Sequence, residues 1–450
     1  MADSNGSTVQ WPDGHVLLRV LDRPLPVAAR GEGVWIYDDA GNAWLDGSSG
    51  AFVTSVGHGN REVVTSIADA LGRLAYVNGT QFTNRPTEDL AARLAALAPP
   101  GLDKAFFLAS GSEAVEASLK FCRQLWYDRG QPQRDTVIAR TPSYHGNTLY
   151  ALSASGRPHY KTVYGPLLSD VATVSSPYEY RSNAPAWPGA ASFYADELEA
   201  KIRAIGEDRV AAFIAEPIIG SSAGAALPPP GYFAALREVC DRYGVLMIAD
   251  EVLVGVGRTG TFFACESQGF EPDLLVLGKG IGGGYAALSA VLVKSTHVEE
   301  MKASSGKFMH AQTYMQAPMM TAAGVAVLDY LDRHGVVAHA AEVGVTLQAR
   351  LRERVGRLPG VGNVSGRGLL AGVEFVADRA TRAPFERSRK VAEAVTRAAF
   401  DRGLVVWPNV GQADGTRGDL VMIAPPLTIT RDEIDTLVAR LAAAIDDVLG

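Results

Sequence analysis

The sequence predicts an α/β protein with a mainly parallel central sheet and a second, smaller α+β domain. Short apolar runs alternate with helical stretches between about residues 105 and 331, as in strands joined by crossover helices. After residue 332 strands become few and helices more frequent. We therefore expect a large domain over residues 62–331 and a small domain built from residues 1–61 and 332–450.

The composition excludes several classes of protein. With 47% hydrophobic and 20% charged residues, the 450-residue chain is globular and long enough for a large core. A net charge of −7 argues against a nucleic-acid binder. The three cysteines, Cys122, Cys240 and Cys265, form neither a disulfide framework nor a zinc pattern. The first 14 residues lack an apolar targeting segment, and no apolar run is long enough to span a bilayer. We therefore expect a cytoplasmic protein that has no metal site and does not bind a membrane.

Before residue 105 the pattern predicts two strands and two helices. Strands at 34–37 and 43–46 flank an Asp-Asp-Ala-Gly-Asn turn. A helical period begins at about residue 62, and a second helix at 88–97 ends before Pro99-Pro100-Gly101. The two strands lie outside the central block, so we expect them to join the small domain.

The central block contains five apolar runs that we interpret as buried strands, at 105–109, 136–139, 210–215, 245–249 and 274–277. Helical stretches at 113–126, 195–205 and 232–243 separate several of them, and a helix at 317–331 closes the block. Ligands of such sheets bind beyond the carboxyl ends of the strands. The residues that follow each strand are therefore the candidates for a site.

The C-terminal part predicts a small α+β arrangement. A long helix at 336–357 is followed by a strand at 368–375 and a helix at 388–402. Strands at 404–407 and 419–423 and a final helix at 431–449 complete the chain.

Two of the strands lead into segments that suit a phosphate and a flat ring. Ser110, Gly111 and Ser112 open a helix, where free backbone N–H groups and hydroxyls bind anions. Ser110 and Glu113 also match a capping box, which requires no ligand. Tyr144 and His145, in a loop after the second strand, are placed to stack on a ring or only to pack the loop.

Three further strands end at charged residues. Glu216 and Asp250 close apolar strands, where an acid is costly to bury without a cationic partner, although an exposed strand end would also accommodate Glu216. Lys279 lies between glycines and is placed to form an imine with a carbonyl group. A phosphate site, an aromatic cover, a carboxylate for a ring nitrogen and a lysine are the contacts that pyridoxal 5′-phosphate (PLP) requires.

A competing motif overlaps the lysine. Gly278, Gly280 and Gly283 match the dinucleotide fingerprint G-x-G-x-x-G. The fingerprint needs a helix directly after it, whereas residues 285–293 read as another strand. It also leaves Asp250 and residues 110–112 without a role, and the segment lacks the Ser or Thr of a phosphate-binding P-loop. The pattern favours PLP.

From about Trp35 to its end the chain resembles the class III (ω-type) aminotransferases, PLP-dependent enzymes of fold type I. The resemblance rests on "LMIADEVLVGVGRTG" at 246–260 and "PDLLVLGKGIGGG" at 272–284, in which Lys279 lies 29 positions after Asp250. "SGSEAVEASLK", "SYHGNT" and "APPLTIT" support it. The resemblance implies a homodimer with active sites at its interface.

It also implies roles for single residues. Lys279 would form the aldimine with the cofactor and move the substrate proton, and Asp250 would pair with the ring nitrogen. Tyr144 and Val252 would cover the two faces of the ring. The other implied cofactor contacts are Ser110, Gly111, Ser112, His145, Glu216 and, toward the phosphate of the partner subunit, Thr313.

The substrate pocket implied by the resemblance is aromatic. Phe52 and Phe82 fall where the family lines this pocket. Trp407 stands near the place where many amine:pyruvate members have an arginine for a substrate carboxylate, and Arg417 in the following loop is a replacement candidate.

The predicted function is ping-pong transfer of an amino group from an amine (an ω-amine, an amino acid or an amino sugar) to a keto or aldehyde acceptor such as pyruvate. A PLP-dependent aminomutase, decarboxylase or epimerase on the same scaffold, with a place in secondary metabolism, is the alternative. A non-catalytic nucleotide-binding module is disfavoured, because Lys279 and Asp250 would then have no role.

Overall fold

The computed structural model describes residues 6–182, 184–185 and 189–450. Its central sheet has seven strands in the order β6-β12-β11-β10-β9-β7-β8. They are β6 (Lys104–Leu108), β7 (Thr136–Thr141), β8 (Ala172–Ser175), β9 (Val210–Ala215), β10 (Leu246–Asp250), β11 (Leu274–Leu277) and β12 (Ser289–Val293). Only β12 runs antiparallel to its neighbours β11 and β6, so the prediction of a mainly parallel sheet is confirmed.

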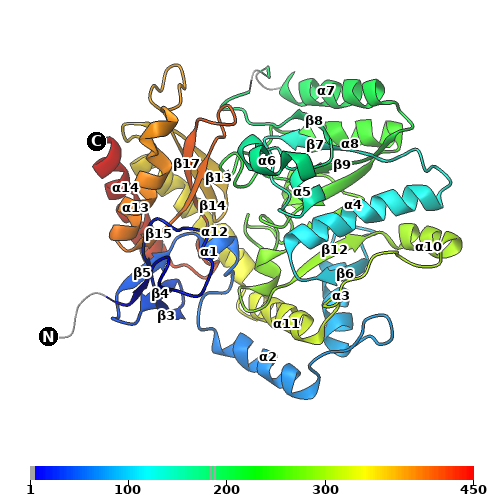
Figure 1. The fold of residues 1–450 in the computed structure, drawn as a ribbon, viewed down its shortest axis with the longest axis horizontal. Helices are drawn as coiled ribbons and strands as arrows, with labels where there is room; N and C mark the ends of the chain where they lie inside the picture. Colours follow the sequence, from blue (N-terminus) through cyan, green and yellow to red (C-terminus); the bar gives the residue numbers. More distant parts are fainter. Residues whose placement is uncertain (1–5, 183, 186–188) are drawn as a thin grey trace.

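Helices cover both faces of this sheet (Figure 1). In β10, Met247 and Ala249 pack into one apolar cluster while Leu246 and Ile248 pack into the other, as the two-residue period of a strand requires. Residues of α3, α7, α8 and α11 contribute to the first cluster, and residues of α4, α5 and α10 to the second. The helices are α3 (Arg85–Leu97), α4 (Gly111–Asp128), α5 (Leu149–Ala154), α7 (Gly189–Ile205), α8 (Tyr232–Tyr243), α10 (Ser295–Ser304) and α11 (Pro318–Arg333).

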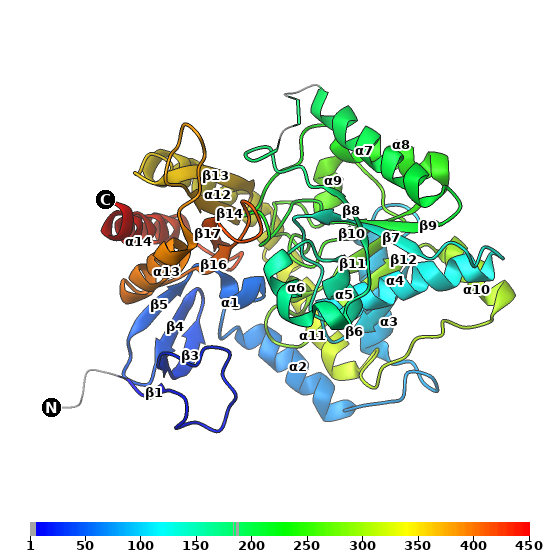
Figure 2. The ribbon, with the colours of Figure 1, turned by 45° about the horizontal axis from the view of Figure 1, so that its top comes forward.

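The N-terminal strands lie beside the C-terminal helices and strands, on one side of the molecule (Figure 2). Two four-stranded sheets lie here, in the orders β13-β14-β17-β16 and β15-β5-β4-β3. Their strands are β3 (Ala28–Glu32), β4 (Trp35–Asp38), β5 (Ala43–Asp46), β13 (Val361–Arg367), β14 (Leu370–Phe375), β15 (Leu404–Val405), β16 (Trp407–Val410) and β17 (Asp419–Ile423). The domain boundaries at residues 61/62 and 331/332 stay a prediction.

Three helices accompany these sheets, α12 (Val336–Arg350), α13 (Val391–Asp401) and α14 (Arg431–Leu449). The other strands and α-helices are β1 (Thr8–Val9), β2 (Leu25–Pro26), α1 (Ser49–Phe52), α2 (Arg61–Arg73), α6 (Pro158–Tyr164) and α9 (Ala264–Gln268). Within the described ranges, no helix is both long and apolar enough to cross a bilayer.

One predicted strand is wrong in a way that matters for the site. Residues 404–407 form two strands, because β15 pairs with β5 while Trp407 begins β16 and pairs with β17. Val406 carries the chain from one small sheet to the other. Strands β8 and β13 were not predicted, since β8 is short and β13 contains two glycines, an asparagine and a serine.

Candidate active site

The carboxyl ends of the parallel strands meet at one edge of the sheet and surround a pocket of about 180 Å³. β9 leads into Glu216, β10 ends at Asp250, and β11 leads into Lys279. The pocket collects eight of the residues that the sequence indicated, namely Gly111, Ser112, Tyr144, His145, Glu216, Asp250, Val252 and Lys279. Ligand binding beyond the carboxyl ends of the strands is the expected property of such a sheet.

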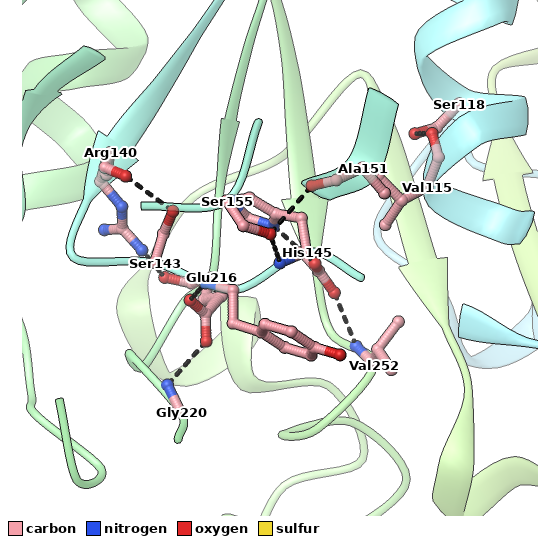
Figure 3. Close-up of polar contacts among 12 residues, drawn as sticks. Val115, Ser118, Arg140, Ser143, His145, Ala151, Ser155, Glu216, Gly220 and Val252 are labelled. Atoms are coloured by element: carbon pink, nitrogen blue, oxygen red, sulfur yellow. Dashed lines mark hydrogen bonds and ion pairs between the residues drawn. The ribbon is translucent and has the colours of Figure 1, made fainter. Parts of the chain in front are cut away.

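Asp250 is a buried carboxylate that is fixed on both oxygens. Its Oδ1 accepts a hydrogen bond from the Val252 N–H at 3.1 Å, and its Oδ2 lies 2.7 Å from His145 Nδ1. His145 is held in turn by its backbone N–H, which donates to Ser155 Oγ at 2.8 Å (Figure 3). Because a carboxylate only accepts, His145 Nδ1 is the donor, and the buried Nε2 has no partner among the described residues.

Glu216 positions the loop that carries Tyr144. Its Oε1 accepts from the Tyr144 N–H at 3.0 Å and its Oε2 from the Gly220 N–H at 2.6 Å (Figure 3). Burial, together with the nearby Asp250 carboxylate, raises the pKa of Glu216. The fully buried Arg140 donates to the backbone carbonyl of Glu216 at 2.6 Å, so a cation supports this acidic strand end.

Lys279 faces the pocket with a free amine. Its side chain forms no ion pair and no hydrogen bond with any residue that the structure describes, and Nζ lies 6.0 Å from the ring centre of Phe52. Burial lowers its pKa, while the Asp250 and Glu216 carboxylates act in the opposite direction. Its backbone has φ 47°, a strained conformation that functional residues adopt more often than others.

The N-terminus of α4 closes one end of the pocket. The Ser110 hydroxyl accepts a hydrogen bond from the Glu113 N–H, and the Glu113 side chain accepts one from the Ser110 backbone N–H. The capping box that the sequence indicated is therefore formed. Ser112 Oγ accepts from the Asn147 N–H at 3.0 Å, which leaves its hydroxyl proton available. Gly111 and Ser112 line the pocket beside this helix end, where backbone N–H groups favour an anion.

Close packing at two glycines brings Val252 into the pocket. A Cβ on Gly111 would lie 2.7 Å from Val252 Cγ1, and a Cβ on Gly278 would lie 3.0 Å from the same atom. Glycine at these two positions therefore lets Val252 pack directly against the backbone. Val252 is thereby pressed between the start of α4 and the Lys279 loop, and Tyr144 lines the pocket from a different loop.

Phe52 and Trp407 form an aromatic wall near Lys279. Their ring centres are 5.4 Å apart, and Phe52 is almost fully buried. Phe52 ends α1, and Trp407 begins β16, so segments about 350 positions apart in sequence meet here.

Six predicted residues are not among those that line the pocket, namely Phe52 and Trp407 and the four that follow. Ser110 is exposed and caps α4. Phe82 is 65% exposed, and Thr313 lies on the surface, where its carbonyl accepts from the Tyr76 hydroxyl. Arg417 forms ion pairs with Asp414 and Glu386 at the surface.

Sequence reasoning missed several residues at or near the pocket. Ile218, Ser221, Leu253 and Val254 line it from the segments that follow β9 and β10, and their proximity to Glu216 and Asp250 was the available signal. Arg157, buried beside Tyr144, was also missed, because nothing in its polar sequence context distinguishes it from a surface arginine.

Comparisons with known proteins show the family of the chain. The family model for aminotransferase class-III matches residues 20–445. The chain belongs to the class III aminotransferases. It is 39% identical over 425 residues to the uncharacterized aminotransferase YodT of Bacillus subtilis (strain 168), covering 94% of this chain and 96% of that one.

Solved structures of omega-transaminases superimpose closely on the chain. A thermostable (S)-enantioselective omega-transaminase from Thermomicrobium roseum has a TM-score of 0.90 at 37% identity, covering 95% of this chain and 93% of that one. The omega transaminase of Pseudomonas jessenii in complex with PMP has a TM-score of 0.88 at 31% identity, covering 94% and 93%. The predicted fold, a PLP-dependent transferase of fold type I, is confirmed.

Proposed function

We propose that this class III aminotransferase uses PLP to move an amino group from an amine to a keto or aldehyde acceptor such as pyruvate. The observation that carries the proposal is the free amine of Lys279 beside the buried carboxylate of Asp250, at the ends of neighbouring strands. The identity of the donor, whether an ω-amine, an amino acid or an amino sugar, is a separate question.

The residues present fit PLP. The unpartnered Nε2 of the buried His145 leaves a polar atom for a ligand to satisfy. The available hydroxyl of Ser112 and the first turn of α4 suit a phosphate, and Val252 and Tyr144 suit the faces of a flat ring. When bound there, PLP would supply a protonated ring that withdraws electrons from the amine carbon of the substrate.

The protein side chains would perform the remaining tasks. Asp250, held by His145 and the Val252 N–H, would stabilise the positive charge on the ring nitrogen. Lys279 would move a proton to and from the amine carbon, and burial assists it by lowering the pKa of its amine toward neutral pH. Glu216 would keep Tyr144 against the ring by accepting its backbone N–H.

We also propose a homodimer in the cytoplasm. Tyr76, Phe82, Met309 and Tyr314 are large apolar side chains that are 44–66% exposed, and Thr313 lies among them in sequence. Exposed apolar side chains concentrated in two segments that touch each other favour burial against a second copy. In such a dimer Phe82 and Thr313 would lie at the interface and contribute to the active site of the partner subunit. The cytoplasm is supported by three buried cysteines that are all free.

The alternatives on the same scaffold are an aminomutase, a decarboxylase or an epimerase. All would use Lys279 and Asp250, so their products distinguish them. Release of a keto or aldehyde product from the donor, with amination of pyruvate, would favour transfer.

The first experiment is a visible absorption spectrum of the purified protein. Amines are added without acceptor and pyruvate is added afterwards. Loss of the cofactor band with some donors and its return with pyruvate would support the proposal, and Lys279→Ala would abolish turnover. Lys302→Ala, which changes an exposed lysine of α10, serves as control. A band that never converts would favour the alternatives, and no band after incubation with PLP would refute the cofactor.

A further inference from the structure

Arg157 is a buried cation next to the ring that closes the pocket. It precedes α6 and is only 7% exposed. Its guanidinium carbon lies 5.7 Å from the ring centre of Tyr144 and 4.6 Å from that of Tyr160. The N–H of Gly156 donates to Ser143 O and Oγ at 3.0 Å each, which ties the segment to the Tyr144 loop. The charge is therefore held at the edge of the active site.

The guanidinium of Arg157 forms no ion pair in the part of the chain that the structure describes, and the Glu216 carboxylate acts on its charge only from a distance. Its side-chain hydrogen bond is made by Nη2 to the neutral Asn409 Oδ1. A guanidinium has five N–H donors, and burying it without an anion is costly. The two other buried arginines, Arg140 and Arg258, also form no ion pair with the described residues, but each makes more hydrogen bonds than Arg157 does. Arg140 donates to Glu216 O at 2.6 Å and to the Tyr232 hydroxyl at 3.3 Å, and Arg258 donates to Leu369 O, Pro425 O and Ser49 Oγ.

A second cation lies at the same place. Arg19, from the N-terminal segment, donates to the Tyr160 hydroxyl at 3.4 Å and forms no ion pair with the described residues. Both Arg19 and Arg157 oppose the rise in the pKa of Tyr144 that burial causes, so both positive charges act at this ring. Two arginines without acidic partners beside a substrate pocket indicate an anionic ligand.

We propose that Arg157, assisted by Arg19, binds a carboxylate of the substrate. The proposal rests on the proposed function and narrows its substrate class to amino acids or keto acids whose carboxylate reaches past the Tyr144 ring. A planar guanidinium suits a carboxylate, because two parallel N–H groups meet its two oxygens. Arg417, the candidate that the sequence offered, is occupied by Asp414 and Glu386, and Trp407 packs against Phe52.

The test compares donors that differ only in the carboxylate. The pairs are β-alanine with ethylamine, 4-aminobutyrate with propylamine, and 6-aminohexanoate with pentylamine, each followed as a single half-reaction at increasing donor concentration. Arg157→Gln should weaken binding of the best carboxylate donor by about 10- to 100-fold and leave its matched amine within about threefold. Arg157→Lys should restore part of the loss. Arg19→Gln, at an exposed position, should cost about two- to fivefold.

Several outcomes would overturn the proposal. If Arg157→Gln weakens binding of the carboxylate donor and of its matched amine equally, Arg157 is a structural support for Asn409. If Arg417→Gln instead weakens only the binding of the carboxylate donor, the carboxylate site lies in the loop that carries Arg417. If Arg157→Gln does not fold, Arg157→Lys decides, because equal binding of the carboxylate donor by wild type and this variant refutes the role.

A readout that does not need turnover separates this proposal from the proposed function. The donors are compared by the shift that each produces in the midpoint of thermal unfolding. A larger shift with 4-aminobutyrate than with propylamine, lost in Arg157→Gln, supports the carboxylate site even if no donor is converted. Conversion of the simple amines with no carboxylate preference in wild type overturns this proposal and leaves the proposed function standing.

Discussion

Gly146 is the position at which a single methyl group should disable the site. A Cβ there would lie 2.5 Å from Ser112 Oγ and 2.9 Å from Ser112 Cα, at a backbone φ of 137°. Since ordinary contact begins near 3.4 Å, the Gly146 loop must retreat from α4 by about 0.9 Å. The same movement stretches the 3.0 Å hydrogen bond from the Asn147 N–H to Ser112 Oγ beyond its working range.

The cost of Gly146→Ala can be built from these parts. The lost hydrogen bond contributes about 1 kcal/mol, backbone strain about 1–2 kcal/mol, and overpacking about 1–3 kcal/mol. The sum is about 3–6 kcal/mol of destabilisation. The larger effect is on catalysis, because a displacement of about 1 Å of groups beside the reacting atoms costs about 100-fold in rate. Tyr144 and His145 directly precede the glycine and would move with it.

The assay is the rate of the first half-reaction with a saturating donor, together with the affinity for PLP. Gly72→Ala is the matched control, since a Cβ at that position, in the last turn of α2, meets no atom within 4 Å. The control should keep the wild-type rate and lose no stability. A Gly146→Ala protein with wild-type PLP affinity and a rate within twofold of wild type would refute the reasoning.

Three further predictions concern charge and shape around the pocket. Asp250→Asn should keep the Val252 contact but lose the charge, lowering the half-reaction rate by about 10²–10³-fold in stopped-flow measurements, and a loss below tenfold would contradict the role of Asp250. Burial raises the pKa of Glu251 to about 7, so the folded chain holds this proton more tightly than the unfolded chain. The resulting stabilisation is present at low pH and is lost as the pH rises through 7, so the gap in melting temperature between wild type and Glu251→Gln should narrow from about pH 5 to about pH 8. A constant gap would show that the acid titrates normally. Phe52→Ala should open the wall against Trp407 and raise kcat/KM for a bulky aryl amine by about tenfold relative to a small amine, while lowering the melting temperature. Equal changes for both amines would place Phe52 outside the pocket.

The sequence predicted those parts of the fold that local pattern controls. β9 and β11 have the predicted bounds, because each is an uninterrupted apolar run buried on both faces. The end of each run then located Glu216, Asp250 and Lys279 at one edge, since parallel strands share a direction. The site followed from topology and needed no knowledge of side-chain contacts.

What could not be predicted depends on contacts between distant segments. The buried Arg157 contacts Asn409, which lies 252 positions later, and no local pattern reports that pairing. The split at Val406 is of the same kind, because the apolar run at 404–407 is continuous while its partners belong to two sheets. Ser110 shows a third limit, since its sequence pattern fits a capping box and a phosphate site alike, and only the structure shows that the capping box is formed.

The parallel pairing of β15 with β5 sets an order of events during synthesis. Leu404 lies opposite Leu45, 359 positions earlier in the chain. At about 5–20 residues per second, a ribosome needs about 20–70 s to make the intervening chain. Throughout that time β5 has an unpaired edge, and Phe52 lacks the Trp407 ring that completes its wall. The central sheet, whose last strand ends at Val293, is complete in sequence more than 100 residues before this closure, so the contact between Phe52 and Trp407 is one of the last parts of the molecule to form.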